Sequence, residues 1–353
     1  GGDGPDGPVA DVAGPMSGGR FAMLVAPSEF TLDRRPAGEP AAGEALLRVR
    51  DCGVCGSDLK MWSGTHAFLR PPLLLGHEIY GCVEAADQLE PGTDVVVFPP
   101  VGCGNCFHCV GAQPQLCADM VFHGGQLPGG LAEHMIVAEA NLVAVPAGIP
   151  ETQRVLIEPL AVGVHAVSRS AAETGECAVV LGGGAIGLFT ALVARAHGLD
   201  VLLFEPSAPR RARAQAVGLK AVEAGGTPVR DVVAELVRPE GADVVFECVG
   251  SGETISAALS ATRKGGRAVV VGNAPASFQV DGLELQRGDR SLVGVLMYER
   301  RDFIDAMGLL AGGLLAALPE TSLVQRFPLD DVGAAFATSK SGALTALRAV
   351  VQP

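Results

Sequence analysis

Aromatic side chains are scarce in this sequence of 353 residues, where Phe, Trp and Tyr together make up 5%. Aliphatic side chains must therefore form most of the core. The totals of 48% hydrophobic and 18% charged residues are typical of a globular protein. A chain of this length is expected to form about two domains, each large enough to bury its own core.

The sequence also lacks long apolar runs, an excess of positive charge and a secretion signal. No run reaches the roughly 18 apolar residues that span a bilayer. With 26 basic and 39 acidic residues the net charge is −13, which repels nucleic-acid phosphates. Residues 1–15 are rich in Gly, Pro and Asp, and we interpret them as a flexible leader before Met16. We therefore expect a cytoplasmic protein that binds neither nucleic acid nor membranes.

Cysteine, in contrast, is plentiful: the nine cysteines favour thiols or metal ligands over disulfides in a chain without an export signal. Cys103, Cys106, Cys109 and Cys117 form a C-x2-C-x2-C-x7-C pattern. Four thiolates at such spacing fill the tetrahedral shell of a structural zinc and leave no open position. An iron–sulfur cluster could also use four cysteines, but the polar Gly/Pro loop beside a nucleotide-type domain favours zinc.

The two parts of the chain differ in their patterns. Residues 21–160 contain short β-branched runs between Gly/Pro turns, which predict strands. From about residue 175, apolar strands alternate with helices, which predicts an α/β protein with a parallel sheet covered on both faces. Helices are expected over 207–218, from 227 and over 252–266; strands are expected over 177–181, 200–205, 242–250, 267–273 and 291–298.

Gly182, Gly184 and Gly187 form a G-x-G-x-x-G turn directly after the first of these apolar strands. The glycines allow a tight turn, close approach of a pyrophosphate and close helix–strand packing, and the phosphates would lie at the helix N-terminus. A glycine-rich turn of another α/β protein is the alternative interpretation. Further expected cofactor contacts are Ala185, Ile186, Val249 and Gly272.

Glu205 ends the next strand, eighteen residues beyond Gly187, where a carboxylate accepts hydrogen bonds from the adenosine ribose. A carboxylate there repels a 2′-phosphate, so NAD is favoured over NADP. Arg210 and Arg211 follow closely and could turn toward such a phosphate, with Arg210 as a further candidate cofactor contact.

A second, open metal site would need fewer protein ligands from separate segments, together with a position for water or substrate. Candidates are Cys55 in "CGVCGSDLKMW", the pair His77–Glu78 in "LLLGHEIYG", and Glu158 in "RVLIEPLAV". Each alone has an ordinary structural interpretation, because a cysteine after a β-run is usually a packing residue and a buried histidine is more often hydrogen-bonded than metal-bound.

The motifs "GVCGSD", "GHE", the four-cysteine pattern, "GGLAEH", "IEPLAV" and "GGGAIG" occur in this order. From about residue 20 to its end the chain thereby resembles the zinc-dependent medium-chain dehydrogenases/reductases, which include alcohol, sorbitol-type polyol, butanediol and threonine dehydrogenases. The resemblance implies a GroES-like catalytic domain over 16–160, a Rossmann domain over 161–298, and a return to the catalytic domain over 299–353. It also implies a homodimer or homotetramer.

The resemblance assigns the catalytic zinc ligands. Cys55 and His77 match two of them, Glu78 is a ligand or near-ligand, and Cys52 is a bystander. Glu158 stands where alcohol dehydrogenases have a cysteine ligand and polyol dehydrogenases have a glutamate.

The resemblance also implies a proton path. Asp58 would orient His77, and Ser57 would contact the substrate hydroxyl and begin the relay. Lys60 departs from the family, many members of which have a histidine there. It could relay a proton, bind an anionic part of the substrate or point to solvent. Trp62 and His66 are candidate residues of the substrate pocket.

The function expected from this resemblance is oxidation of a secondary alcohol to a ketone with hydride transfer to NAD, using one catalytic and one structural zinc per subunit. Glu158 favours a polyol, cyclitol or similar metabolite as the substrate. The alternatives are an NADPH-dependent carbonyl reductase, a dehydrogenase of a phosphorylated or amino-substituted sugar alcohol, and a scaffold without catalysis, which would be expected to lack the candidate ligands.

Overall fold

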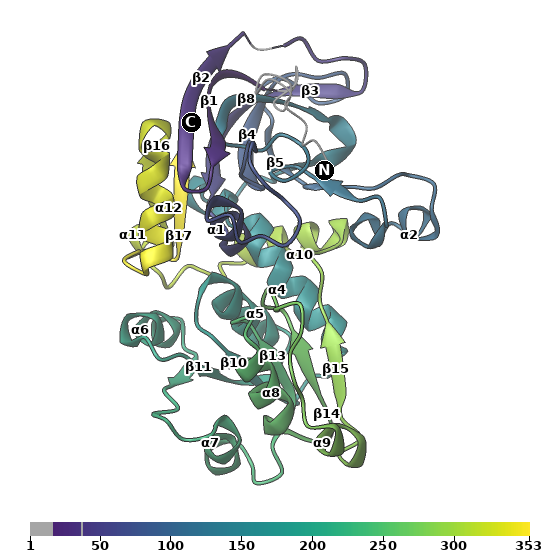
Figure 1. The fold of residues 1–353 in the computed structure, drawn as a ribbon, viewed down its shortest axis with the longest axis vertical. Helices are drawn as coiled ribbons and strands as arrows, with labels where there is room; N and C mark the ends of the chain where they lie inside the picture. Colours follow the sequence, from purple (N-terminus) through teal and green to yellow (C-terminus); the bar gives the residue numbers. More distant parts are fainter. Residues whose placement is uncertain (1–16, 37) are drawn as a thin grey trace, which may run out of the picture. The chain divides into compact units, whose positions relative to one another are not determined.

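The computed structural model describes residues 17–36 and 38–353 (Figure 1). The predicted leader and Met16 lie outside these residues. The chain forms two compact units, of which the first ends at Glu158 and resumes over Glu320–Pro353, and the second is Pro159–Pro319.

The return to the first unit thus begins at Glu320 rather than at the predicted residue 299, because helix α10 (Arg300–Ala311) stays with the second unit. Asp302 of α10 lies 2.8 Å from Nδ1 of His165 on helix α4 (Ile157–Ser170). Both side chains are buried, so this pair ties α10 to the second unit.

The first unit is built on a sheet in the order β2-β1-β8-β3-β4-β5-β9, with β17 pairing both β3 and β16. Along β3 the buried Leu47 and Val49 alternate with the exposed Arg48 and Arg50, as expected where one face of a sheet meets the core. The strands are β1 (Ser17–Ala26), β2 (Glu29–Arg35), β3 (Glu44–Gly53), β4 (Glu78–Ala85), β5 (Asp94–Val97), β8 (Ala132–Ala138), β9 (Leu142–Ala144), β16 (Val324–Pro328) and β17 (Arg348–Gln352).

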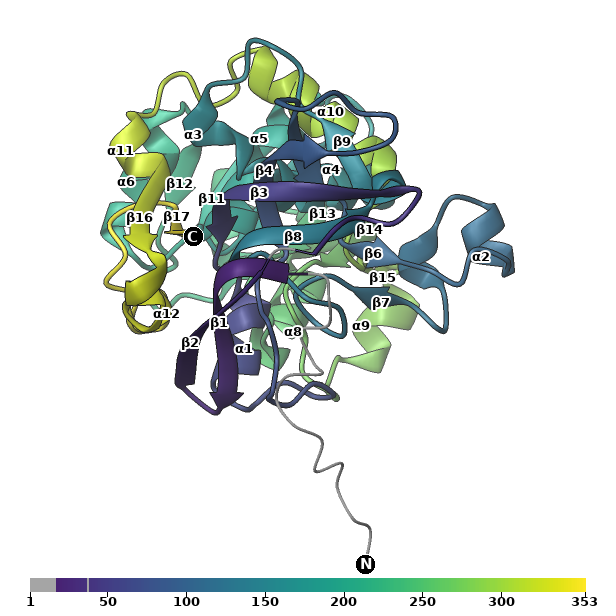
Figure 2. The ribbon, with the colours of Figure 1, turned by 90° about the horizontal axis from the view of Figure 1, so that it is seen from above.

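Short helices accompany this sheet: α1 (Gly56–Trp62), α3 (Glu151–Arg154), α11 (Glu320–Leu323) and α12 (Val332–Ser341). A separate lobe contains α2 (Phe107–Val110) and stands out from the sheet beyond β6 (Pro100–Val101) and β7 (Val121–Phe122), as Figure 2 shows. None of the residues of α2 is buried, so apolar packing contributes little to the order of this lobe.

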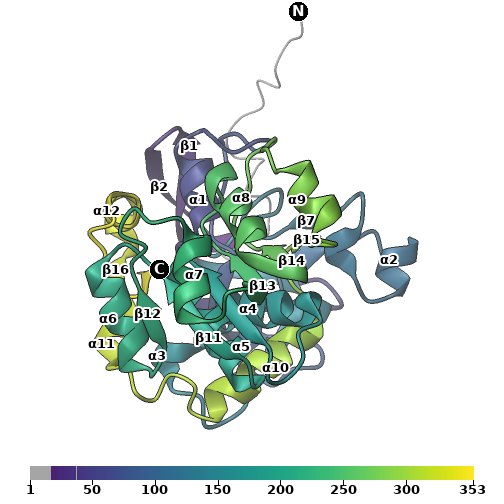
Figure 3. The same cartoon turned by 90° about the horizontal axis from the view of Figure 1, so that it is seen from below.

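The second unit contains a six-stranded parallel sheet in the order β12-β11-β10-β13-β14-β15. Helices cover both of its faces (Figure 3), which confirms the predicted doubly wound fold. Val179 and Leu181 of β10 pack in a cluster with α7 and α8, and by alternation Val180 points to the other face. The strands are β10 (Cys177–Leu181), β11 (Asp200–Phe204), β12 (Lys220–Val222), β13 (Ala242–Glu247), β14 (Thr262–Val270) and β15 (Ser291–Gly294). The remaining helices are α5 (Ala185–Ala196), α6 (Ala208–Ala216), α7 (Val229–Leu236), α8 (Gly252–Ala261) and α9 (Gly282–Arg287).

Several predicted boundaries are wrong. The strand expected over 242–250 ends at Glu247, and the strand expected over 267–273 begins at Thr262 and ends at Val270. The helix expected over 252–266 ends at Ala261, where β14 begins, because Nε of Arg263 donates to Asp243 on β13 at 2.6 Å and holds the chain along that strand. The strand expected over 291–298 ends at Gly294, and the positive φ of 50° at Met297 is incompatible with a continued strand.

Among the described residues, no helix combines the length and apolarity needed to cross a membrane.

Candidate active site and metal centres

The first centre is built where β3 ends and α1 begins. Cys55 is the N-cap residue of α1, and its backbone N–H donates to Oδ2 of Asp58 at 2.9 Å. Asp58 is fully buried, so this bond fixes its carboxylate beneath the helix N-terminus, where a negative charge is favoured.

His77 enters the same centre from a turn just before β4. Gly76 has a φ of +97°, and a Cβ there would lie 2.3 Å from Sγ of Cys52. Burial raises the pKa of the Cys52 thiol well above its ordinary value, so this neutral thiol packs beneath the turn. That position agrees with the predicted role of Cys52 as a bystander.

The two ring nitrogens of His77 have different neighbours. Nδ1 lies 3.3 Å from Oδ1 of Asp58, and Nε2 lies 3.4 Å from Oγ of Ser57. Burial lowers the pKa of His77, but the charge and hydrogen bond of Asp58 outweigh burial and hold the pKa well above its ordinary value. A carboxylate on one nitrogen of a histidine fixes the ring and increases the basicity of the other nitrogen, which suits Nε2 to bind a metal.

Cys55, His77 and Glu78 each offer a ligand atom, and these three atoms lie within 4.8 Å of one another. Sulfur, imidazole nitrogen and carboxylate oxygen are the donors that bind zinc. The residues present therefore fit a zinc ion with an open position. Glu158, the fourth predicted ligand, is buried at the start of α4 and lies outside this group of three.

Arg348 is a site residue that sequence reasoning missed. Its Nη2 lies 2.7 Å from Oε1 of the fully buried Glu78, and its Nη1 donates to the carbonyl of Val54 at 3.4 Å. Burial raises the pKa of Glu78, against the opposing charges of Arg348 and His77. No local pattern could reveal this pair, because Arg348 lies 270 residues beyond Glu78 and reaches it only through the pairing of β17 with β3.

The second centre is the four-cysteine lobe. One ligand atom from each of the four predicted cysteines lies within 4.8 Å of the other three. The backbone N–H of Cys109 and the thiols of the other three cysteines lower the pKa of Cys106 to about 7. Gly102 leaves room for this arrangement, because a Cβ there would lie 2.4 Å from Sγ of Cys109. Four converging sulfurs, one readily ionised, fit a closed structural zinc site.

The glycine turn in the second unit has the predicted geometry. Gly182 has a φ of +97°, and a Cβ on Gly187 would lie 1.8 Å from the carbonyl oxygen of Gly182. Gly184 is the N-cap residue of α5, and a Cβ there would meet nothing within 4 Å. Gly182 and Gly187 thus close the turn, whereas Gly184 leaves open space at a helix N-terminus, which fits a pyrophosphate. Ala185 and Ile186 form the first turn of α5.

Glu205 follows β11 as predicted, and its carboxylate is fixed by the backbone. Oε2 accepts the N–H of Gly183 and Oε1 accepts the N–H of Ser207, both at 2.7 Å. A guanidinium nitrogen of Arg210 lies 3.8 Å from Oε2, with 46% of the Arg210 side chain exposed. The site therefore holds a fixed acid with a solvent-accessible cation beside it.

The two remaining predicted cofactor contacts lie on segments after β13 and β14. A Cβ on Gly182 would lie 2.9 Å from Cγ2 of Val249, which is 55% exposed, and a Cβ on Gly272 would lie 2.3 Å from the nitrogen of Gly250. The segment after β13 therefore passes close to the glycine turn, and the segment after β14 passes close to the segment after β13.

Three further predicted residues lie on α1 or the loop after it. Lys60 and His66 are partly exposed. Trp62 is buried in the core of the first unit against Phe336, with Lys340 over its ring at 5.2 Å. The structure thus places Trp62 in the core rather than on the wall of the predicted pocket.

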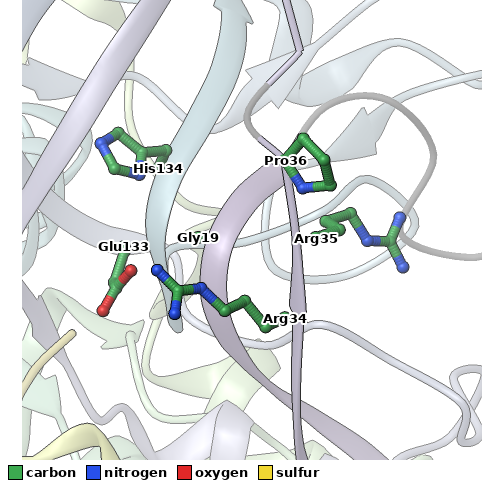
Figure 4. Close-up of a pocket in the computed structure, with 6 residues that line it drawn as sticks. All are labelled: Gly19, Arg34, Arg35, Pro36, Glu133 and His134. Atoms are coloured by element: carbon green, nitrogen blue, oxygen red, sulfur yellow. The ribbon is translucent and has the colours of Figure 1, made fainter.

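A hollow of about 510 Å³ lies on β1, β2 and β8, away in sequence from all predicted site residues (Figure 4). Its carboxylate, Glu133, is bound by Arg20 at 2.9 Å, and His134 lies 3.3 Å from Glu84. The side chains of Glu133 and His134 are therefore both engaged in ion pairs within the protein. The lining residues are Gly19, Arg34, Arg35, Pro36, Glu133 and His134.

Comparisons with known proteins match both units. A family profile described as "Alcohol dehydrogenase GroES-like domain" matches residues 41–147, and one described as "Zinc-binding dehydrogenase" matches residues 185–312. The chain is 35% identical to 2-dehydro-3-deoxy-L-galactonate 5-dehydrogenase of Pseudoalteromonas atlantica, over 90% of this chain and 94% of the relative. It is 31% identical to sorbitol dehydrogenase of Homo sapiens, over 90% and 91%. A solved structure from Sinorhizobium meliloti 1021 with bound NADP matches with a TM-score of 0.86 and 27% identity, over 95% and 99%.

Proposed function

The chain belongs to the zinc-dependent medium-chain dehydrogenase family, and from this premise we propose that it oxidises a secondary hydroxyl of a polyol or sugar acid to a ketone, with NAD as the hydride acceptor. It is a zinc- and nicotinamide-dependent alcohol dehydrogenase. The convergence of Cys55, His77 and Glu78 carries the proposal, since it supplies a three-ligand site with an open position. The names of the two relatives, which act on a sugar acid and on sorbitol, support the substrate class.

The residues of the first centre have complementary tasks. Cys55 and His77 would hold the zinc through Sγ and Nε2, with Glu78 as a ligand or near-ligand and Glu158 as a further candidate. Bound zinc supplies a Lewis acid that lowers the pKa of the substrate hydroxyl. Asp58 keeps the His77 ring in place through Nδ1.

Ser57 is placed to move the proton. Its hydroxyl lies beside Nε2 of His77, where it can accept the proton of the substrate hydroxyl and pass it outward. Loss of that proton favours departure of a hydride from the carbinol carbon, for which a bound nicotinamide would supply the acceptor. The glycine turn and Glu205 of the second unit would bind the pyrophosphate and the adenosine ribose of the cofactor.

NAD is proposed over NADP because both oxygens of Glu205 are fixed at the ribose position, where the charge opposes a 2′-phosphate. Arg210 and the similar solved structure with bound NADP favour NADP, the second candidate cofactor. The ratio of kcat/KM for NAD and NADP tests this. We expect wild type to prefer NAD, and Glu205→Ser to shift the ratio toward NADP by at least about tenfold. A wild-type preference for NADP would contradict the assignment.

The central test is replacement of the ligands. Cys55→Ser and His77→Asn should each abolish turnover of every alcohol and reduce the zinc content from two to one per chain. The affinity for NADH, measured by fluorescence titration, should stay nearly unchanged. Full activity in either variant would refute the zinc mechanism, and reduction of carbonyls with NADPH alone would establish the reductase alternative. We further propose a cytoplasmic location, which agrees with nine free cysteines.

A further inference from the structure

The carboxyl edge of the parallel sheet in the second unit carries one buried acid. A row of paired residues crosses this edge at the last position of β11, β10, β13, β14 and β15, and its members are Phe204, Leu181, Glu247, Val270 and Gly294. All but Glu247 are apolar or glycine, whereas Glu247 is ionisable and fully buried. A carboxylate in such a row is costly unless hydrogen bonds satisfy it, so its hydrogen bonds indicate what it does.

One oxygen of the Glu247 side chain accepts three hydrogen bonds. Its Oε1 accepts the backbone N–H of Val249 at 2.8 Å, the N–H of Gly250 at 2.7 Å and the hydroxyl of Thr254 at 2.8 Å. Among the residues that the structure describes, the buried Oε2 has no hydrogen-bond partner. Oε1 therefore closes the turn that follows β13 and ties this turn to the first turn of α8.

The backbone of Glu247 holds the segment that follows β14. Its carbonyl accepts the N–H of Val271 at 2.9 Å and that of Gly272 at 2.8 Å. The two segments touch backbone to backbone, because a Cβ on Gly272 would lie 2.3 Å from the nitrogen of Gly250. Gly250 itself has a φ of +85°, and a Cβ there would lie 2.8 Å from the carbonyl oxygen of Asn273. A displacement of one segment therefore displaces the other.

The turn held by Glu247 carries a side chain over the glycine turn. Cγ2 of Val249 lies 2.9 Å from the place of a Cβ on Gly182, and 55% of Val249 is exposed. The strand order β12-β11-β10-β13-β14-β15 is that of a fold with two mononucleotide-binding halves (Figure 1). Because β10, β11 and Glu205 belong to the adenosine half, β13 and β14 belong to the nicotinamide half.

We infer that Glu247 is a positioning residue for the nicotinamide half of the cofactor. Its side chain fixes the turn at Val249 and Gly250, and its carbonyl fixes the segment at Gly272, so both walls depend on one residue. Glu205 has the corresponding task in the adenosine half, where its two oxygens accept backbone N–H groups. The inference rests on the proposed dehydrogenase function and adds a residue that acts on the cofactor through its neighbours.

The test compares the binding of NADH with that of ADP, which contains the adenosine half but no nicotinamide. Glu247→Ala leaves two buried N–H groups without an acceptor, so titration calorimetry should show a Kd for NADH raised by about tenfold or more and a Kd for ADP changed by less than about twofold. Glu247→Gln should recover most of the loss, because its carbonyl oxygen can accept all three bonds of Oε1. Glu205→Ser, in contrast, should weaken the binding of both ligands.

Asp243→Asn is the matched control, because Asp243 is also a buried acid of β13 but lies near the opposite end of that strand. It should lower the stability and leave both Kd values unchanged. A second readout is hydrogen exchange of the cofactor-free protein, followed by mass spectrometry. The peptide over 248–254 should exchange faster in Glu247→Ala than in wild type, and at the wild-type rate in Asp243→Asn.

An unchanged Kd for NADH in folded Glu247→Ala would overturn the inference. Equal weakening of NADH and ADP would also overturn it, because Glu247 would then support the unit as a whole, and so would a similar loss of NADH binding in Asp243→Asn. If Glu247→Ala does not fold, Glu247→Asp takes its place with the same expected results, since the shorter side chain withdraws the acceptor. Failure of the wild type to bind either NADH or NADPH would refute the proposed function itself.

Discussion

Among single residues, the glycines of the cofactor turn separate two roles that a motif alone cannot distinguish. Gly187 is needed for the fold, because a methyl group there would clash with the carbonyl of Gly182 at 1.8 Å. Gly184 is surrounded by open space, so its lack of a side chain serves the ligand.

We therefore predict different defects for Gly187→Ala and Gly184→Ala. The first should lower the melting temperature by several degrees, as expected for overpacking of about 1–3 kcal/mol. The second should keep the melting temperature and weaken NADH binding by about tenfold or more. Thermal melts and NADH fluorescence titrations would check both, and normal cofactor binding by folded Gly184→Ala would contradict the assignment.

The sequence identified the site residues that lie within short motifs and missed Arg348, which lies far from these motifs along the chain. Cys55, Ser57 and Asp58 follow one another in "CGSD", so local spacing was enough to bring them together. Arg348 contributes only through β17, and no spacing rule connects it to Glu78. Trp62 was misplaced because a residue beside a motif can point into the core, and only the packing against Phe336 decides its direction.

At the scale of elements, the α2 lobe has almost no apolar core of its own. Phe107 is 85% exposed and Val110 is 77% exposed. A segment that buries so little apolar surface depends on another constraint for its order, which we propose is a zinc ion held by the four cysteines.

We predict that Cys109→Ser reduces the zinc content from two to one per chain and makes the lobe a site of rapid proteolysis. Cys82→Ser, which changes a cysteine of β4 outside both metal groups, should leave zinc content and protease resistance unchanged. Metal analysis and limited proteolysis with mass spectrometry would measure this. An intact lobe in metal-depleted Cys109→Ser would show that packing alone holds it.

Strand β13 is tied to its neighbours by the carboxylate of Asp243. Burial raises its pKa, but hydrogen bonds from Arg238, the N–H of Cys177 and Arg263 outweigh burial and lower the pKa to about 2. A depressed pKa means that the stabilisation is complete above the unfolded value of about 3.9 and is lost as pH falls toward about 2.

Asp243→Asn should therefore reduce the free energy of unfolding by about 2 kcal/mol near pH 7. The difference from wild type should stay constant down to about pH 5 and shrink below about pH 4. Urea unfolding at several pH values would measure it. A difference that is independent of pH down to pH 3 would show that the carboxylate charge is not the source.

The sequence predicts helices and strands where apolar runs and glycine turns mark them. It does not predict the end of an element where a contact with a residue far away in the sequence sets that end. Gly265 and Gly266 mark a helix end in the sequence, but residues 262–264 have no local signal that would end the helix earlier. The contact of Arg263 with Asp243 does so, and it depends on strand pairing that no window of sequence contains.

For the whole molecule, assembly is the main open prediction. β15 is an edge strand of the six-stranded sheet, and Leu296 just beyond it is 49% exposed. An apolar sheet edge of this kind favours pairing with a second copy. We predict a homodimer or homotetramer, and light scattering at micromolar concentration should give at least twice the chain mass of 36.0 kDa. Leu296→Asp should shift the protein toward monomer, unlike Ile304→Asp on α10; a monomeric wild type would contradict the prediction.

The change of sequence pattern near residue 175 predicts the division into two units. It does not predict the second boundary, at which the chain returns to the first unit. A helix with one buried face, such as α10, suits either unit, and the buried pair of His165 and Asp302 decides the matter. Such a pair joins residues 137 positions apart, so the boundary depends on tertiary structure.

The discontinuous first unit has a consequence for protein synthesis. Its sheet needs β17, where Val351 lies opposite Cys52 and Arg348 reaches Glu78. The ribosome completes Pro159–Pro319 before it makes this strand, and domains generally fold as they emerge. The cofactor-binding unit can thus fold on the nascent chain while the metal-binding unit still waits for its final strand. A premature stop codon before Arg348 would spare the cofactor-binding unit and leave Glu78 without its counter-charge.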